Sequence, residues 1–213
     1  MAGLSEDWLG RWAQGRTGWH EAAGNAGLRS YWPDTDSPGS VLLPLCGKTP
    51  DLLWLVRRGH DVVGVELSAV AVESFFDEHE LQFDRDPDGP LIRYAARDLP
   101  LVLFCGDYFE FQATGFDALY DRGALVALAA EQRPRYVDHT KRLLRPGAMR
   151  MIVTLEYVQD IVSGPPYSVA AGELSGYWDD MVKVGEKDDI DNCPPKFRHA
   201  GLTEIKEVFW LSQ

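Results

Sequence analysis

Four short segments with residues that could bind a ligand each come at the end of an apolar run that is typical of a buried strand. They are the turn Leu45–Lys48, Glu66, the pair Asp107–Tyr108 and the pair Asp121–Arg122. In a strand–turn–helix–strand unit, a carboxylate at the tip of the second strand accepts both hydroxyls of a ribose, because it is a rigidly held bidentate acceptor. The run DVVGV stops at Glu66, and Ser68 can open a helix two residues later. Glu66 is therefore our predicted ribose-binding residue.

The turn LPLCGKTP limits which ribose-containing ligand fits. A dinucleotide fold uses GxGxxG to bring the backbone against pyrophosphate, and a P-loop uses GxxxxGK[ST]. This turn has a single glycine, Gly47, before Lys48, which is too little for either phosphate-binding loop. The sequence therefore favours a nucleoside ligand without phosphate, and S-adenosylmethionine fits this description.

The elements around this turn follow from hydrophobic pattern and capping. Val41–Leu45 and Val62–Val65 are predicted strands. Between them, Thr49 and Pro50 start a predicted helix that ends at Arg58-Gly59. Ser68 caps a further predicted helix that runs to about Leu81.

The rest of the chain alternates between apolar runs and helical patterns. The other predicted elements are a short helix carrying Trp8 and Trp12, a hairpin of Leu91–Ala95 and Leu101–Cys105, a strand Phe116–Tyr120, a helix from about Gln132 to Leu144, a strand Met149–Tyr157, a helix Ala170–Val182, and strands near Lys196–His199 and Glu204–Leu211. The segments DRDPDGP and 186–191 are predicted loops. This alternation predicts a parallel sheet with helices on both faces, which binds its ligand at the carboxyl ends of the strands.

Composition narrows the class of protein. The 213 residues and near-average hydrophobic content predict one globular domain, residues 1–213. The net charge of -12 makes nucleic acid an unfavourable partner, and no apolar run reaches the roughly 18 residues of a membrane span. The three cysteines form no CxxC pair, which argues against a disulfide framework and a zinc site. We expect a cytoplasmic monomer that binds a small molecule and no metal.

Three longer stretches carry a resemblance to a known family. The runs PLCGKTPDLLWLVRRGHDVVGVELS, FDALYDRGALVAL and GPPYSV, in this order, resemble the thiopurine S-methyltransferase family. The resemblance extends from WLGRWAQGRTGWH to FRHAGL. It implies an α/β, Rossmann-like class I methyltransferase fold, with a mostly parallel seven-stranded sheet and residues 1–33 as an N-terminal segment that covers the cofactor. It also implies S-adenosylmethionine as cofactor and in-line methyl transfer to aromatic or heterocyclic thiols such as thiopurines.

The resemblance further implies roles for individual residues. The expected cofactor contacts are Trp8, Trp12, Leu45, Glu66, Asp107, Tyr108 and Arg122. Trp19 and Arg122 match substrate-side positions, and Arg122 is the expected catalytic residue, because a guanidinium favours the thiolate form of a thiol.

Other interpretations of the same residues stay open at this point. Trp8 and Trp12 could be ordinary helix packing, and Arg122 could pair with Asp121 or Glu131. The acceptor could instead be a small inorganic or aliphatic nucleophile, such as a selenium, tellurium or hydrosulfide species. A third possibility is a cofactor-binding protein without catalysis that acts through a partner.

Overall fold

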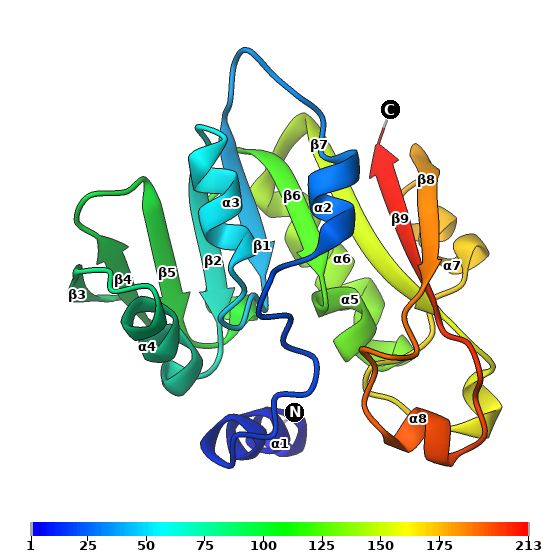
Figure 1. Ribbon diagram of the computed structural model, residues 1–213. Helices are drawn as coiled ribbons and strands as arrows, with labels where there is room; N and C mark the ends of the chain where they lie inside the picture. Colours follow the sequence, from blue (N-terminus) through cyan, green and yellow to red (C-terminus); the bar gives the residue numbers. More distant parts are fainter. Residues whose placement is uncertain (1, 213) are drawn as a thin grey trace. The chain divides into compact units, whose positions relative to one another are not determined.

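The computed structural model describes residues 2–212, with side chains from residue 8 to residue 212 (Figure 1). The chain forms two compact units. Unit 1 comprises residues 2–24 and 35–113, and unit 2 comprises residues 25–34 and 114–212. Each unit is an α/β structure with its own strands and helices.

Unit 1 contains the predicted turn and ribose-binding carboxylate. Its elements are α1 (Ala2–Ala13), β1 (Ser40–Pro44), α3 (Asp51–Arg57), β2 (Asp61–Glu66), α4 (Ala69–Glu78), β3 (Phe83–Asp88), β4 (Leu91–Ala96), β5 (Leu101–Cys105) and a 3-10 turn η1 (Tyr108–Glu110). The strands lie in the order β3-β4-β5-β2-β1. β2 runs parallel to β1 and to β5, whereas β4 is antiparallel to both β5 and β3.

Local signals explain how the helices of unit 1 begin. The Ser68 hydroxyl accepts a hydrogen bond from the N–H of Ala71, so Ser68 caps α4 as predicted. Before α3, the Thr49 hydroxyl accepts a hydrogen bond from the N–H of Asp51. The cap residue is Pro50 rather than Thr49, so the helix begins one residue later than predicted. Four apolar side chains of α4 are buried, namely Ala71, Val72, Phe75 and Phe76.

Unit 2 carries the remaining strands. Its elements are α2 (Ala26–Tyr31), β6 (Phe116–Arg122), α5 (Ala124–Ala127), η2 (Ala130–Gln132), α6 (Arg133–Leu143), β7 (Leu144–Glu156), η3 (Gln159–Ile161), α7 (Ala171–Tyr177), β8 (Met181–Asp188), α8 (Lys196–His199) and β9 (Lys206–Ser212). The strand order is β6-β7-β9-β8, with β6 and β7 parallel and the other pairs antiparallel. Within this unit, α2 lies on one face of the strands and α6 on the other (Figure 1).

Packing of α2 on its strands depends on two small features. The Asn25 side chain accepts hydrogen bonds from the N–H groups of Gly27 and Leu28 and so caps the helix. A Cβ at Gly27 would lie 2.0 Å from the ring of Phe209 on β9, so only glycine allows this approach.

The α/β class is confirmed, and the number of strands is corrected. Residues 2–212 contain nine strands rather than seven, with antiparallel strands at the edge of each unit. The predicted loop DRDPDGP contains all of β3 but its first residue, and β3 tolerates Pro87 because it is an edge strand. The helix predicted for Ala170–Val182 ends at Tyr177, and the chain continues as β8.

A further correction concerns the C-terminal part of unit 2. The segment Lys196–His199 is the short helix α8 instead of a strand, and it follows Pro194 and Pro195, which suit a helix start. The predicted strand Glu204–Leu211 is confirmed as β9 with a start two residues later.

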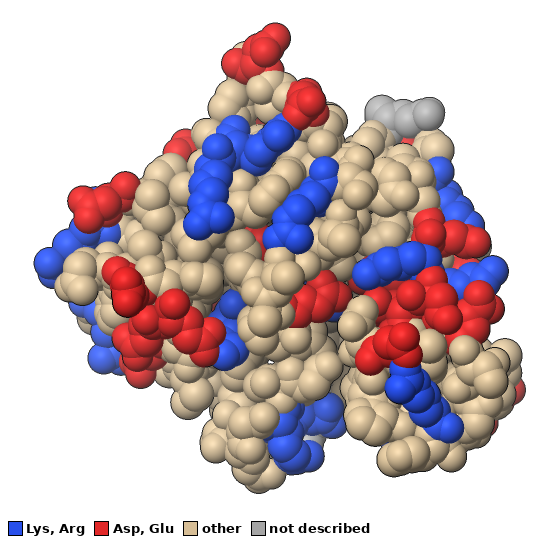
Figure 2. Space-filling view, in the orientation of Figure 1, with Lys and Arg blue, Asp and Glu red and all other residues tan. Residues whose placement is uncertain are grey.

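Surface charge agrees with the composition. Figure 2 shows Asp and Glu side chains interspersed with small groups of Lys and Arg on the visible face, rather than one broad basic surface among the described residues. No helix within the described part of the chain is long and apolar enough to cross a membrane.

Candidate functional site

The turn after β1 is held against the N-terminal helix of unit 1. Leu45 has a φ of 49° and Gly47 a φ of 57°, and a left-handed conformation at a leucine is uncommon. Such local strain often marks a functional segment. A Cβ at Gly47 would lie 3.2 Å from the indole of Trp12, so this ring packs directly on the turn.

Glu66 ends β2 and fastens two segments to each other. Its Oε2 accepts a hydrogen bond of 2.8 Å from the N–H of Gly47, and its Oε1 accepts one of 2.9 Å from the N–H of Ser68. The side chain is buried, and this burial raises the pKa of the carboxyl, while the backbone N–H groups act to lower it. Glu66 therefore sits at a fixed position at the carboxyl end of β2.

This geometry fits the hydroxyls of a ribose. The two oxygens of a carboxylate offer more acceptor positions than the backbone N–H groups of Gly47, Ser68 and Leu67 can occupy. The Glu66 carboxylate therefore keeps acceptor capacity for a ligand hydroxyl. The backbone donors also set the direction in which these remaining positions point.

The predicted adenine-flanking residues lie next to Glu66 in unit 1. The parallel register pairs Glu66 with Cys105, so the ends of β2 and β5 are neighbours. Directly after β5, the exposed side chain of Asp107 accepts a 2.9 Å hydrogen bond from the N–H of Phe109, and Tyr108 is buried. Unit 1 thus brings Leu45, Glu66, Asp107 and Tyr108 to the carboxyl ends of adjacent strands.

Three tryptophans of unit 1 form one aromatic cluster. The ring of Trp19 meets Trp8 at 5.0 Å and Trp12 at 5.8 Å between centroids, both edge to face. Trp12 is buried, whereas Trp8 and Trp19 are partly exposed. The structure therefore brings the predicted cofactor-side and substrate-side tryptophans together, and Trp12 connects the cluster to the turn at Gly47.

In unit 2, β6 ends in Asp121 and Arg122. The buried Asp121 carboxylate accepts hydrogen bonds from the N–H groups of Ala124 and Leu125 and from the hydroxyl of Tyr136. Burial raises the pKa of Asp121 to about 6 even though all three donors oppose this change. Asp121 therefore acts as a structural cap for the turn that follows Arg122.

Arg122 has a partner that the sequence did not indicate. Its Nε lies 4.0 Å from Oε1 of Glu207 on β9, whereas Asp121 and Glu131 had been the alternatives. Glu207 is almost fully buried and also contacts Asn25 and Lys187. No motif pointed to Glu207, because the residues that surround it are far apart in sequence.

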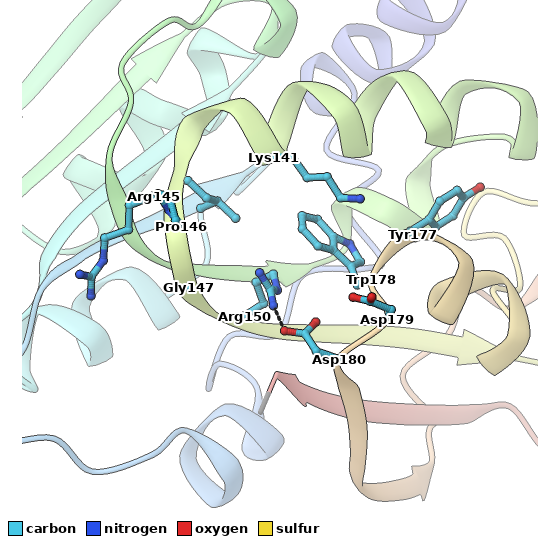
Figure 3. A pocket seen from close by; sticks show the side chains of 10 residues that line it. Lys141, Arg145, Pro146, Gly147, Arg150, Tyr177, Trp178, Asp179 and Asp180 are labelled. Carbon is cyan, nitrogen blue, oxygen red and sulfur yellow. Dashed lines mark hydrogen bonds and ion pairs between the residues drawn. The ribbon is translucent and has the colours of Figure 1, made fainter.

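A cavity of about 410 Å³ in unit 2 lies away from these residues. It opens where α6 ends and β7 begins, and Figure 3 shows Trp178 at its centre with Lys141 and Arg150 nearby. Both cations lie within 5 Å of the indole centroid, at 4.8 and 4.9 Å, and Arg150 also pairs with Asp180. β6 and β7 are parallel, so this cavity and Arg122 lie at opposite ends of the strand pair. The cavity contains none of the predicted site residues.

Comparison with known proteins identifies the family. The sequence model described as "Thiopurine S-methyltransferase (TPMT)" matches residues 4–213. The chain belongs to the thiopurine S-methyltransferase family. A relative named thiopurine S-methyltransferase from Bordetella petrii is 40% identical, with 98% of each chain covered. One of the same name from Pseudomonas putida is 41% identical, covering 97% of this chain and 98% of its own.

Solved structures confirm the fold class. The 1,6-didemethyltoxoflavin-N1-methyltransferase of Burkholderia thailandensis, solved with S-adenosylhomocysteine, matches with a TM-score of 0.63 at 17% identity, covering 100% of this chain and 88% of its own. Because the chain belongs to the thiopurine S-methyltransferase family, it is a methyltransferase with S-adenosylmethionine as its cofactor. The carboxylate of Glu66, held by backbone N–H groups at the carboxyl end of β2, has the chemistry to accept a hydrogen bond from the ribose of that cofactor.

Proposed function

We propose that this protein transfers the methyl group of S-adenosylmethionine to the sulfur of an aromatic or heterocyclic thiol, such as a thiopurine. The observation that carries the proposal is the family match over residues 4–213. The fold alone does not choose the acceptor, because the structural neighbour from Burkholderia thailandensis is named for methylation at nitrogen. Since the match spans both units, we propose that residues 1–213 act as one methyltransferase domain.

The residues of unit 1 supply cofactor binding in this proposal. Glu66 accepts the two ribose hydroxyls, Asp107 and Tyr108 flank the adenine, and Leu45 contacts the cofactor from the turn. Support comes from the fixed position of the Glu66 carboxylate and from the register that places β5 beside it.

The N-terminal segment 1–33 covers the cofactor in this proposal. Trp8 and Trp12 supply aromatic faces that attract a sulfonium cation and exclude water. Trp19 offers a ring on which a planar thiol can stack. The contact of Trp12 with the turn at Gly47 supports this assignment, because that turn also donates to Glu66.

The chemistry requires alignment more than it requires a strong base. When bound, S-adenosylmethionine supplies a methyl group on a sulfonium, which is a good leaving group. The acceptor thiol would lose its proton to water, and its sulfur would take the methyl group with S-adenosylhomocysteine as the leaving group. In our proposal, Arg122 touches the acceptor and favours its thiolate form, and holding the two sulfurs in line provides most of the acceleration.

The first test is direct detection of the reaction. The purified protein is incubated with S-adenosylmethionine and 6-mercaptopurine, and methylated thiopurine and S-adenosylhomocysteine are measured by mass spectrometry. Both products are expected from the wild type. Cofactor binding without any methylated thiol would contradict the proposal and favour a small inorganic acceptor or a noncatalytic role, which assays with hydrosulfide and selenium species then separate.

The second test isolates the ribose contact. Glu66→Gln keeps the side-chain volume but loses the charge, so it is expected to weaken S-adenosylmethionine binding by roughly a hundredfold, since hydrogen bonds to charged groups contribute about 1.5–3 kcal/mol each. Isothermal titration calorimetry measures the dissociation constant. The control is Glu80→Gln, an exposed carboxylate two residues beyond the end of α4, which is expected to leave binding unchanged. An unaltered affinity in Glu66→Gln would show that the ribose assignment is wrong.

A further inference from the structure

Glu207 is a buried carboxylate that the proposed reaction does not yet use. It lies on β9 directly opposite Lys187 on β8, and its side chain is 2% exposed. Its Oε1 accepts a 2.9 Å hydrogen bond from Nδ2 of Asn25, and its Oε2 lies 2.9 Å from Nζ of Lys187. A side chain on β9 is thus tied to α2 and to the edge strand of unit 2.

The surroundings of Glu207 disfavour the charged form of its carboxyl group. Burial raises the pKa of Glu207, and the nearby carboxylate of Asp189 raises it further. Lys187 lies between the two acids, at 3.2 Å from Asp189. Because buried ion pairs often contribute little to stability compared with apolar residues of similar size, the position of this charge needs another explanation.

The position of the Glu207 carboxylate is explained by its neighbour Arg122, at the end of β6. Nε of Arg122 is 4.0 Å from Oε1 of Glu207, the oxygen that also accepts from Asn25. The Arg122 side chain is 21% exposed, so it is held inside the protein along most of its length. An arginine side chain loses rotamer entropy when it is fixed, and the charge of a buried carboxylate 4.0 Å from Nε favours the orientations of the guanidinium that face it.

We propose that Glu207 is a positioning residue, whose carboxylate fixes the orientation of the Arg122 guanidinium so that its Nη groups face the acceptor sulfur. This inference rests on the proposed function, because it concerns the group that we assign to the thiolate. Glu207 itself touches neither substrate nor cofactor in this proposal. Asn25 and Lys187 hold the carboxylate in place, and so the orientation of Arg122 is set by residues from α2, β8 and β9.

A purely structural role for Glu207 makes a different prediction. In that case Glu207 serves only Lys187 and Asn25, and its loss affects stability without any special link to Arg122. Asp189 provides the matched control, because it is a buried carboxylate that also pairs with Lys187. The Asp189 carboxylate pairs with Lys187 and accepts a hydrogen bond from the side chain of Asn192.

The kinetic test is a double-mutant cycle with 6-mercaptopurine as acceptor. Glu207→Gln is expected to lower kcat/KM for the thiol by about tenfold, a typical coupling between neighbouring residues. In an Arg122→Ala background, Glu207→Gln is expected to cause no further loss. Asp189→Asn is expected to leave kcat/KM within about twofold of the wild type. An equal loss from Glu207→Gln in both backgrounds, or an equal loss from Asp189→Asn, would overturn the proposal.

A second measurement does not depend on activity. The Nε–Hε signal of Arg122, assigned by NMR with Arg122→Lys, is expected to be sharp and slow to exchange in the wild type and in Asp189→Asn. It is expected to broaden in Glu207→Gln and in Glu207→Asp, which keeps the charge but withdraws it by one methylene group. If the wild type methylates no thiol, the proposed function is wrong. The NMR signal still shows in that case whether Glu207 orders the side chain of Arg122. An unchanged signal in both Glu207 variants would show that the positioning role is wrong even in an active enzyme.

Discussion

Glu66 in unit 1 and Glu207 in unit 2 are both buried carboxylates beside predicted site residues, and different kinds of donor hold them. Glu66 accepts from the backbone N–H groups of Gly47 and Ser68, which are 19 and 2 residues away in sequence. Glu207 is held by the side chains of Asn25, 182 residues away, and of Lys187.

This difference in donors predicts that the two carboxylates differ in how strongly their positions depend on the side chains around them. Backbone donors persist whatever side chain stands at their position, provided that the turn keeps its shape. Side-chain donors can be removed by a single substitution, and a buried charge left without them is destabilising. We therefore expect unit 2 to respond strongly to side-chain changes and unit 1 to respond mainly to changes in its backbone turn.

The largest effect on stability is expected at Arg133 in unit 2. This buried side chain donates to both carboxylate oxygens of Glu173 at 2.8 Å and to the carbonyls of Leu128 and Ser168. Arg133→Met removes all these donors, so it is expected to lower the free energy of unfolding by about 3–5 kcal/mol. Urea denaturation measures it, and Arg142→Met, an exposed position on the same helix, is the control. Equal losses in the two variants would contradict the view that side-chain donors hold unit 2 together.

The next effect concerns Asp121 and depends on pH. Its pKa is about 6 in the folded protein and 3.8 ordinarily. Because the folded pKa is raised, the stability from this group is fully present only well below the unfolded pKa of 3.8 and is lost as the pH rises through 6. At about 1.4 kcal/mol per pKa unit, wild type is expected to lose about 2 kcal/mol relative to Asp121→Asn between pH 4 and pH 7. Urea denaturation at both pH values checks this, and a constant difference between the two proteins would refute it.

A smaller effect is expected from the turn of unit 1. Gly47→Ala places a Cβ at a φ of 57° and 3.2 Å from Trp12. A left-handed alanine costs about 1–2 kcal/mol, and displacement of the turn is expected to weaken S-adenosylmethionine binding several-fold. Gly15→Ala is the matched control, because it has a φ of 65° but no atom within 4 Å of its Cβ. Loss of affinity in both variants would mean that the contact with Trp12 is not the cause.

The smallest effect is expected at an exposed ion pair of unit 1. Arg97 pairs with Asp84 at 2.9 Å, and both side chains are more than half exposed. Arg97→Gln is expected to change the free energy of unfolding by less than about 0.5 kcal/mol, because water screens such pairs. Thermal unfolding at low and high salt measures the change. A loss comparable with that of Arg133→Met would remove the distinction between buried and exposed pairs on which the comparison depends.

Elements with local signals were predictable from the sequence. The cap Ser68, the strand that ends at Glu66 and the helix that carries Trp12 all follow from spacing within a few residues. β8 was missed because it is an edge strand with Lys183, Glu186 and other charges, and such a pattern resembles a solvated loop.

The sequence by itself determined the family, the cofactor class and the residues of the strand–turn–helix–strand unit. The reason is that these features depend on residue types and spacings within one continuous stretch of the chain. Only the tertiary structure decided what surrounds Arg122. Its partner Glu207 is brought close by antiparallel pairing of β9 with β7 and β8. The sequences of these strands contain no motif that indicates this pairing. The contacts of Glu207 form only when segments that are distant in sequence come together in the fold.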